Sequence, residues 1–160
     1  SAIRHVLETF SGLPDRLEKI RTWRGILFVN DTTATTPDAT IAALDAFTQR
    51  PEYKNADLHL IFGGADKELQ FQEVASVIES ANIHIYVLPG TAQDKIIKSF
   101  HAANILFQSV PDLREAMRLI RQRAKKGDVV LLSPGCASFG LFKNEFDRGE
   151  QFKKIVSRLP

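Results

Sequence analysis

The sequence contains only one cysteine, Cys136, among its 160 residues, so an internal disulfide is excluded. A lone cysteine is typical of proteins that stay in a reducing cytosol, and we expect a cytoplasmic location. No apolar run approaches the ~20 residues that a membrane-spanning helix needs, and the first ten residues carry no signal-peptide core. The chain also lacks the patterns G-x-x-x-x-G-K-[ST] and G-x-G-x-x-G, so it has no nucleotide-cradling loop of its own.

The sequence also lacks a large excess of positive or of negative charge. The 21 Lys and Arg residues are interleaved with 19 Asp and Glu residues, which gives a formal net charge of +2 and argues against nucleic acid as a partner. No spacing of His, Cys, Asp and Glu resembles a metal site, so we predict no metal ligand in this chain. His59 and His84 fall within apolar runs and are interpreted as structural. Cys136 has no neighbouring histidine in the sequence, which argues against a catalytic thiol.

What the sequence does contain is a regular alternation of short apolar runs and helical periodicities. The apolar runs predict strands at 26–29, 58–62, 83–88, 104–107 and 129–133. Helical stripes lie between and after them, within residues 41–47, 71–78, 96–100, 113–120 and 142–156. This order is typical of βαβ units, in which helices cover both faces of a mostly parallel sheet. Residues 17–23 read as a further strand, and Arg24-Gly25 predicts a tight turn into the next one.

The predicted architecture is therefore an α/β, Rossmann-like, three-layer αβα sandwich with about six strands, one of them an antiparallel edge strand. The length fits one domain, residues 1–160. Ile3, Val6, Leu7 and Phe10 would share one helical face, so the sequence begins as if within a helix, which suggests part of a longer chain. We expect a monomer.

Polar and glycine-rich segments follow three of the predicted strands. They are 30-NDTTATTP-37, 63-GGADK-67 and 133-SPGCAS-138. In open α/β sheets, ligands bind outside the carboxyl ends of the strands, so these segments are the candidate site. The other two strand ends, 89–91 and 108–112, are interpreted as plain turns with helix caps.

Each segment also has a purely structural interpretation. Thr36 and Pro37 make a good helix start, but capping leaves Asn30, Asp31, Thr33 and Thr35 unexplained. Gly63-Gly64 is explained by a tight turn. Lys67, placed just before a helix, would oppose the helix dipole, which points to an anionic partner. In the segment 133–138, a serine at the start of the last helix either caps that helix or, with the backbone N–H groups there, binds a carboxylate or phosphate.

These segments together resemble the C-terminal domain of the Mur ligases, closest to the members that add D-glutamate. The resemblance rests on 12-GLPDRLE-18, 30-NDTTATTPDATIAAL-44, 61-IFGGADK-67 and 131-LLSPGCASFGLFKNEFDRGEQF-152. It covers essentially the whole chain but about a third of a complete enzyme, whose N-terminal and central ATPase domains would be absent here. It implies an ATP- and Mg²⁺-dependent ligase of the bacterial cytoplasm that joins D-glutamate to UDP-MurNAc-L-alanine for peptidoglycan. This domain would be the lid that holds D-glutamate, inactive alone, with no cofactor bound to it.

The resemblance also implies roles for individual residues. D-glutamate would contact Thr35, Lys67, Ser138, Phe139 and Phe146, whereas the nucleotide would meet Arg16, Asn30, Asp31 and Thr33 when the lid closes. No catalytic residue and no metal ligand is expected in this domain alone.

The chain departs from the family pattern at a few positions. Thr33 stands where the family usually has lysine, Asp15 where it usually has histidine, and Glu145-Phe146 reverses the usual order of an aromatic and an acid. Two alternatives remain open: the lid of a related ligase, such as another Mur ligase or a folylpolyglutamate synthase, or a non-catalytic α/β binding module.

Overall fold

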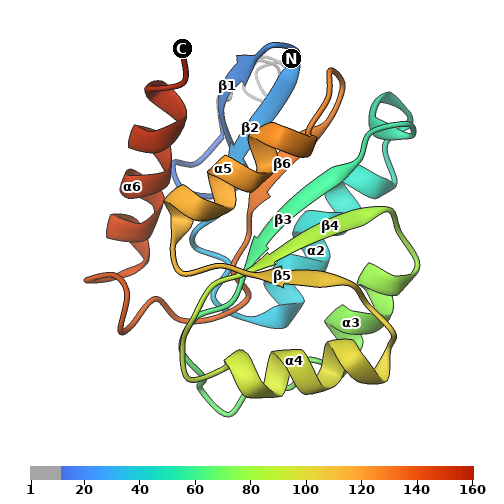
Figure 1. Ribbon diagram of the computed structural model, residues 1–160, viewed down its shortest axis with the longest axis vertical. Helices are drawn as coiled ribbons and strands as arrows, with labels where there is room; N and C mark the ends of the chain where they lie inside the picture. Colours follow the sequence, from blue (N-terminus) through green and yellow to red (C-terminus); the bar gives the residue numbers. More distant parts are fainter. Residues whose placement is uncertain (1–11) are drawn as a thin grey trace, which may run out of the picture.

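The computed structural model describes residues 12–160, and Figure 1 shows their arrangement. The predicted helical face of residues 3–10 lies outside the described residues. The strands are β1 (Glu18–Trp23), β2 (Ile26–Asn30), β3 (Leu58–Phe62), β4 (Ile83–Val87), β5 (Phe107–Ser109) and β6 (Val129–Leu132). The helices are α2 (Pro37–Thr48), the 3₁₀ turn η1 (Pro51–Tyr53), α3 (Gln72–Glu79), α4 (Gln93–Ala102), α5 (Leu113–Arg123) and α6 (Glu145–Ser157).

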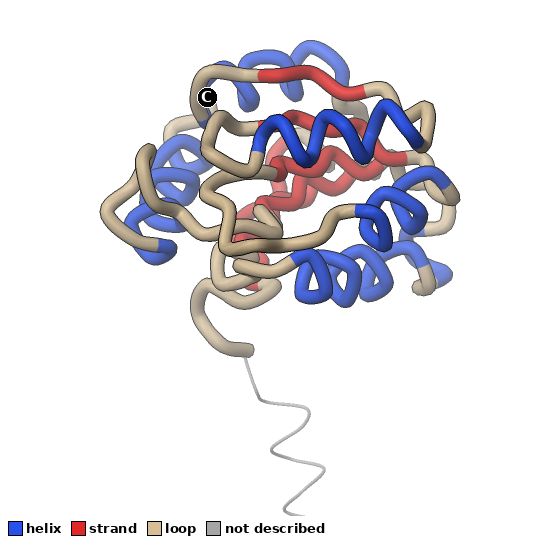
Figure 2. Tube along the Cα trace, turned by 90° about the horizontal axis from the view of Figure 1, so that it is seen from below, coloured by secondary structure: helices blue, strands red, loops and turns tan. Residues whose placement is uncertain are grey.

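The strands form one six-stranded sheet in the order β1-β2-β6-β3-β4-β5. Every neighbouring pair is parallel except β1 and β2, which pair antiparallel at one edge. Figure 2 shows the strands between two layers of helices. The predicted three-layer αβα sandwich with one antiparallel edge strand is therefore confirmed.

The turn between β1 and β2 is as tight as its sequence predicts. Arg24 has φ 51° and Gly25 has φ 80°, so both central residues are in the left-handed region. A two-residue turn with two positive φ values matches the twist of the strands it joins. The hairpin is therefore fixed by local chemistry.

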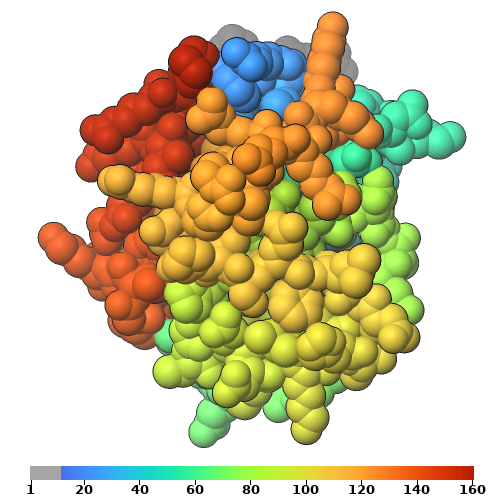
Figure 3. Space-filling view, in the orientation of Figure 1, coloured from blue at the N-terminus to red at the C-terminus, as the bar shows by residue number. Residues whose placement is uncertain are grey.

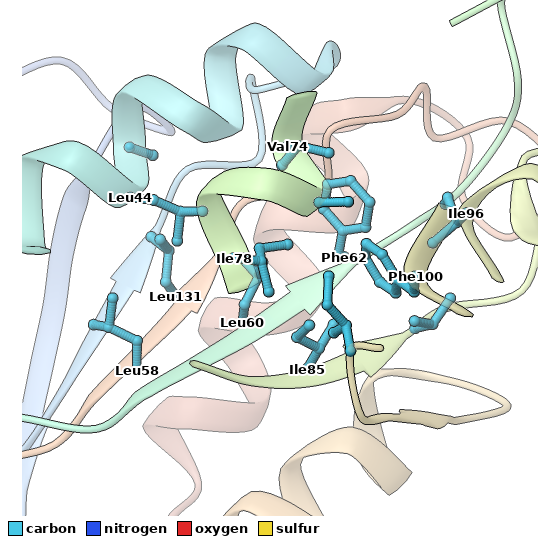
Figure 4. Close-up of a cluster of buried hydrophobic side chains, with 14 of the residues drawn as sticks. Leu44, Leu58, Leu60, Phe62, Val74, Ile78, Ile85, Ile96, Phe100 and Leu131 are labelled. Atoms are coloured by element: carbon cyan, nitrogen blue, oxygen red, sulfur yellow. The ribbon is translucent and has the colours of Figure 1, made fainter. Parts of the chain in front are cut away.

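Two apolar cores lie on opposite faces of the sheet because alternate strand residues point to opposite sides. On β3, Leu58, Leu60 and Phe62 pack against α2, α3 and α4, while Ile61 faces α5 and α6. Figure 4 shows the first core, in which Phe62 lies close to Phe100 of α4 and to Val74 of α3. The two rings have their centroids 6.0 Å apart.

The predicted strand at 104–107 is wrong, since β5 begins only at Phe107. Asn104 takes φ 53°, which turns the chain sharply after α4 and prevents an extended conformation there. Ile105 is buried in the core, but Leu106 is 91% exposed. Ile105 and Leu106 thus belong to a connection. The strand itself is a short edge strand of three residues that begins with Phe107.

Two helix boundaries also differ from the prediction. Helix α6 begins at Glu145, after the Asn144 side chain accepts a hydrogen bond from the Asp147 N–H at 2.9 Å. Helix α3 begins at Gln72. By contrast, the predicted cap of α2 is confirmed, because the Thr36 hydroxyl accepts a hydrogen bond from the Ala39 N–H at 3.4 Å and Pro37 occupies the first helical position.

Within residues 12–160, no helix is long and apolar enough to cross a membrane.

Candidate functional site

The three polar loops named above meet at the carboxyl edge of the sheet. They follow β2, β6 and β3, which are consecutive strands in the sheet although β6 comes last in the chain. Backbone hydrogen bonds join the loops: the Gly63 N–H donates to the Pro134 carbonyl at 2.8 Å, and the Gly135 N–H donates to the Ala34 carbonyl at 2.9 Å. Segments about 70 to 100 residues apart in sequence therefore form one continuous surface.

The loops after β3 and β6 approach so closely that side chains are excluded between them. Ala65 and Ala137 form an isolated antiparallel bridge. A Cβ atom on Gly64, whose φ is 149°, would lie 2.3 Å from the Ala137 carbonyl oxygen. The Gly63-Gly64 pair therefore allows two backbones to touch, which is a stronger requirement than the tight turn predicted from sequence.

A buried hydroxyl network fixes the loop that follows β2. The Ser133 hydroxyl donates to Asp31 Oδ2 at 2.8 Å, and the Thr40 hydroxyl donates to the Ser133 carbonyl at 3.1 Å. Asp31 Oδ1 accepts a further hydrogen bond from the Leu17 N–H at 3.1 Å. Burial raises the pKa of the Asp31 carboxyl above its ordinary value, although these hydrogen bonds oppose the shift.

Arg148 of α6 ties two of the loops together. Its guanidinium donates to the Thr32 hydroxyl at 3.0 Å, to the Thr32 carbonyl at 2.8 Å and to the Cys136 carbonyl at 3.1 Å. The side chain is fully buried, and burial lowers its pKa to about 10. No carboxylate of residues 12–160 lies within ion-pair distance of it.

Sequence reasoning missed Arg148, although a signal was present. Arg148, Phe152 and Val156 are spaced four residues apart, so they lie on the same buried stripe of α6. A cation within an apolar stripe must find acceptors, and here the acceptors are the carbonyls of the site loops.

Lys67 lies beside Phe139, which brings together two residues of the predicted D-glutamate group. The ammonium nitrogen of Lys67 is 5.4 Å from the centroid of the Phe139 ring, whose residue is 60% exposed. Lys67 itself is exposed and forms no ion pair with a carboxylate of the described chain. The prediction that it precedes a helix directly is wrong, because α3 begins five residues later and the helix dipole does not act on it.

The loop carrying Lys67 is anchored through its neighbour Asp66. The Asp66 N–H donates to the Thr91 hydroxyl at 2.8 Å, and the Asp66 carboxylate pairs with Lys95 at 2.5 Å. The loop after β4, which contains Thr91, is therefore not the plain turn that the sequence predicted. It supports the neighbouring loop, a role that no local pattern indicates.

Ser138 and Thr35 present hydroxyl groups at the same edge. Neither hydroxyl forms a hydrogen bond with another residue of the range 12–160, although Ser138 is only 3% exposed and Thr35 is half-buried. The proposed capping role of Ser138 is wrong, since Asn144 caps α6. Phe146 lies in the first turn of α6, is 57% exposed, and makes no aromatic or cation–π contact within the described chain.

The residues predicted to face a nucleotide gather on the other side of the β2 loop. Arg16, Asp31 and Thr33 line a small cavity of about 120 Å³ next to α2. Thr33 is held there because its hydroxyl donates to the Asp15 carbonyl at 2.9 Å. The Asn30 amide is fully buried and donates to Asp15 Oδ1 at 2.7 Å, so it supports this loop from beneath.

Cys136 and the strand histidine His59 both lie inside the fold. Cys136 is buried, and burial raises the pKa of its thiol to about 12. His59 is buried between Asp128 and Tyr86, with ring nitrogens 3.2 Å from Asp128 Oδ2 and 3.3 Å from the Tyr86 hydroxyl. Across the stretch from residue 12 to residue 160, no His, Cys, Asp and Glu residues form a group that could hold a metal ion.

Fold and loops together define a class of protein. The chain belongs to the family described as Mur ligase, glutamate ligase domain, whose model matches residues 15–136. That range contains Arg16, the β2 loop and the Lys67 loop.

Individual relatives are more specific. The chain is 42% identical to the UDP-N-acetylmuramoylalanine–D-glutamate ligase of Roseiflexus sp. (strain RS-1), in a match that covers 96% of this chain and 32% of that protein. It is 36% identical to the enzyme of the same name from Borreliella burgdorferi (strain ZS7), over 96% of this chain and 33% of that protein. The chain thus spans about a third of the length of these relatives.

Solved structures share the fold at lower identity. UDP-N-acetylmuramate-alanine ligase from Thermotoga maritima has a TM-score of 0.67 at 17% identity, over 96% of this chain and 32% of that one. The FolC protein of E. coli, solved with DHPP and ADP, has a TM-score of 0.63 at 18% identity, over 91% of this chain and 32% of that one. These likenesses concern the fold alone.

Proposed function

We propose that this chain is the D-glutamate-binding domain of an ATP-dependent ligase that joins D-glutamate to UDP-MurNAc-L-alanine. The observation that carries the proposal is the placement of Lys67 beside the Ser138-Phe139 segment, as an exposed cation without a carboxylate partner among residues 12–160. The relatives named D-glutamate ligases support the choice of amino acid.

The site residues match the chemistry of D-glutamate, which carries two carboxylates and one amine. Lys67 supplies a positive charge, while Ser138 and Thr35 supply hydroxyl donors that no other described residue uses. The Phe139 ring lies close enough to the Lys67 ammonium group for a cation–π interaction. In the complete ligase, ATP would phosphorylate the carboxylate of UDP-MurNAc-L-alanine. The amine of D-glutamate would then attack the acyl carbon, and phosphate would leave.

Arg16 and Thr33 fit a contact with one edge of a nucleotide that is held by another domain. Their cavity of about 120 Å³ is well below the roughly 300–1,000 Å³ of pockets that enclose a small molecule. Arg16 is exposed and can reach outward, whereas Asp31 is engaged by Ser133 and Leu17. ATP and Mg²⁺ would therefore bind mainly outside this chain, and this domain would close over them.

The test is amino-acid-dependent ATP turnover by the full-length ligase, with UDP-MurNAc-L-alanine as acceptor. D-Glutamate should support turnover, whereas L-glutamate and other amino acids should not. A preference for another amino acid, or a folate acceptor, would replace this proposal by that of a related ligase.

Lys67→Ala tests the site itself. A charged hydrogen bond contributes about 1.5–3 kcal/mol, so the KM for D-glutamate should rise about 10- to 150-fold while the KM for ATP moves much less. Lys98→Ala, which removes an exposed lysine of α4, is the matched control and should leave both constants unchanged. A shift in the KM for ATP alone would assign Lys67 to the nucleotide and refute its proposed role.

A further inference from the structure

A groove of about 520 Å³ lies between α5 and α6, on the face of the sheet opposite α2, α3 and α4. Figure 3 shows this face, where the side chains of α5 (orange) lie beside those of α6 (red). None of the residues assigned to the candidate site lines the groove. Its role is therefore separate from that of the three loops.

All charged residues that line the groove are cations. Five of its nine lining residues are Lys or Arg, and none is Asp or Glu. On α5 the cations are Arg114, Arg118 and Arg121. On the other side they are Lys154 of α6 and Arg158, the residue that caps the C-terminus of α6. Spacings of three and four residues place each set along one helix face, so two rows of positive charge face each other across the groove.

Most of this charge is uncompensated. Arg118 pairs with Glu115, with nitrogen–oxygen distances of 2.7 and 2.8 Å. No carboxylate of residues 12–160 lies within 4.0 Å of the other four cations. Like charges held close together repel, so this concentration of cations indicates an acidic partner rather than a contribution to folding.

The floor of the groove is apolar, in contrast to its rims. Met117, Ile155 and Leu159 line it, and all three belong to or pack against the core that α5 and α6 form on the sheet. An apolar floor with a cationic rim on each side is complementary to an amphipathic helix whose apolar stripe is flanked by Glu or Asp. From Arg114 to Arg121 the rim extends seven residues, or about 10 Å, which matches two turns of such a helix.

We propose that the α5–α6 groove is a docking site for an acidic amphipathic helix of a partner protein. The aromatic ring of Trp23 marks the end of the groove, where the guanidinium carbon of Arg121 lies 5.5 Å and that of Arg24 lies 4.6 Å from the ring centroid. A bound acidic helix would draw these cations toward itself. Trp23 is the only tryptophan of the 160 residues and therefore reports on this end of the groove.

The experiment uses the full-length protein and a fluorescent synthetic peptide of about 18 residues, roughly five helical turns, with leucines on one face flanked by glutamates. The anisotropy of the peptide measures binding at low and at high salt. The emission of Trp23, obtained by subtracting the emission of a Trp23→Phe variant, shows whether the peptide binds at this end of the groove. We expect saturable binding that weakens with salt, and a change in Trp23 emission. A scrambled peptide of the same composition should bind at least about tenfold more weakly.

Charge reversal identifies the surface. Arg114→Glu combined with Arg158→Glu should raise Kd by about tenfold or more, whereas Lys54→Glu combined with Lys98→Glu, exposed cations elsewhere, should leave it unchanged. Equal binding of the scrambled peptide or of inorganic polyphosphate would overturn the proposal in favour of a general polyanion surface. Unchanged binding by the Arg114/Arg158 variant would also overturn it, as would self-association of the protein that this variant abolishes, because the occupant would then be a second copy.

Discussion

Removing the buried guanidinium of Arg148 should destabilise the domain strongly. Arg148→Ala would leave the Thr32 and Cys136 carbonyls buried without their donor, at about 1–3 kcal/mol each, and would add a cavity in α6. The two orphaned carbonyls and the cavity together predict a loss of about 3–5 kcal/mol. Arg148→Ala also removes the cost of burying the guanidinium, which keeps the expected loss below the upper end of the sum.

Urea unfolding followed by circular dichroism measures this loss, and the melting temperature should fall by about 6–20 °C. Arg148→Lys keeps a charge but not three donors in one plane, so it should recover less than half of the loss. Arg158→Ala removes an exposed arginine at the C-cap of the same helix and should change stability by less than about 0.5 kcal/mol. A loss below about 1 kcal/mol for Arg148→Ala would refute the reasoning, because the loops would then be held without it.

Three further outcomes are expected. Because burial raises the pKa of Cys136 to about 12, iodoacetamide should not label the native protein at pH 8. Cys136→Ala should change kcat of the full-length ligase by less than about tenfold. Rapid labelling would contradict this expectation, because it would show an accessible thiolate. Burial lowers the pKa of His59, so the free energy of unfolding should be constant above the ordinary pKa of 6.5 and fall below it, by up to about 1.4 kcal/mol per pH unit, as the unfolded chain takes up a proton that folded His59 refuses. In denaturant titrations, His59→Gln should flatten this decline, and an unchanged decline would contradict the assignment to His59. The 160-residue chain alone should neither hydrolyse ATP nor bind it with micromolar affinity in calorimetry, because it has no phosphate loop.

Local features of the fold were predictable from the sequence because short-range chemistry decides them. Thr36-Pro37 starts α2 and Arg24-Gly25 turns the hairpin, each through its own backbone preferences. The position of β5 was not predictable in this way. The apolar residues within 104–107 are equally compatible with a strand and with a buried connection. The positive φ of Asn104, which no sequence pattern indicated, makes this segment a connection.

The sequence predicted which three loops form the candidate site, but it did not predict the contacts that hold these loops together. The sequence placed three polar segments at one sheet edge, and the structure joins them through Asp31, Ser133 and the Ala65–Ala137 bridge. The buried stripe of α6 marks Arg148 as a buried cation, but its partners, the Thr32 hydroxyl and the carbonyls of Thr32 and Cys136, could not be read from the sequence. Lys67 was singled out because it was expected just before a helix, and the start of α3 at Gln72 removes that reason. Its role in binding stays a prediction.

The position of β6 in the sheet has a consequence for how the domain is made. This strand is the last in the chain, yet it lies between β2 and β3, and Ser133 meets Asp31 across 102 residues of sequence. A ribosome that has synthesised this domain only as far as residue 120 or so has therefore produced a sheet that lacks β6 and in which the β2 and β3 loops are apart. Contacts of such long range are slow to form, because the intervening chain must be ordered first. We expect the binding surface to appear as the final event of folding, and every chain that is cut short before β6 to lack it entirely.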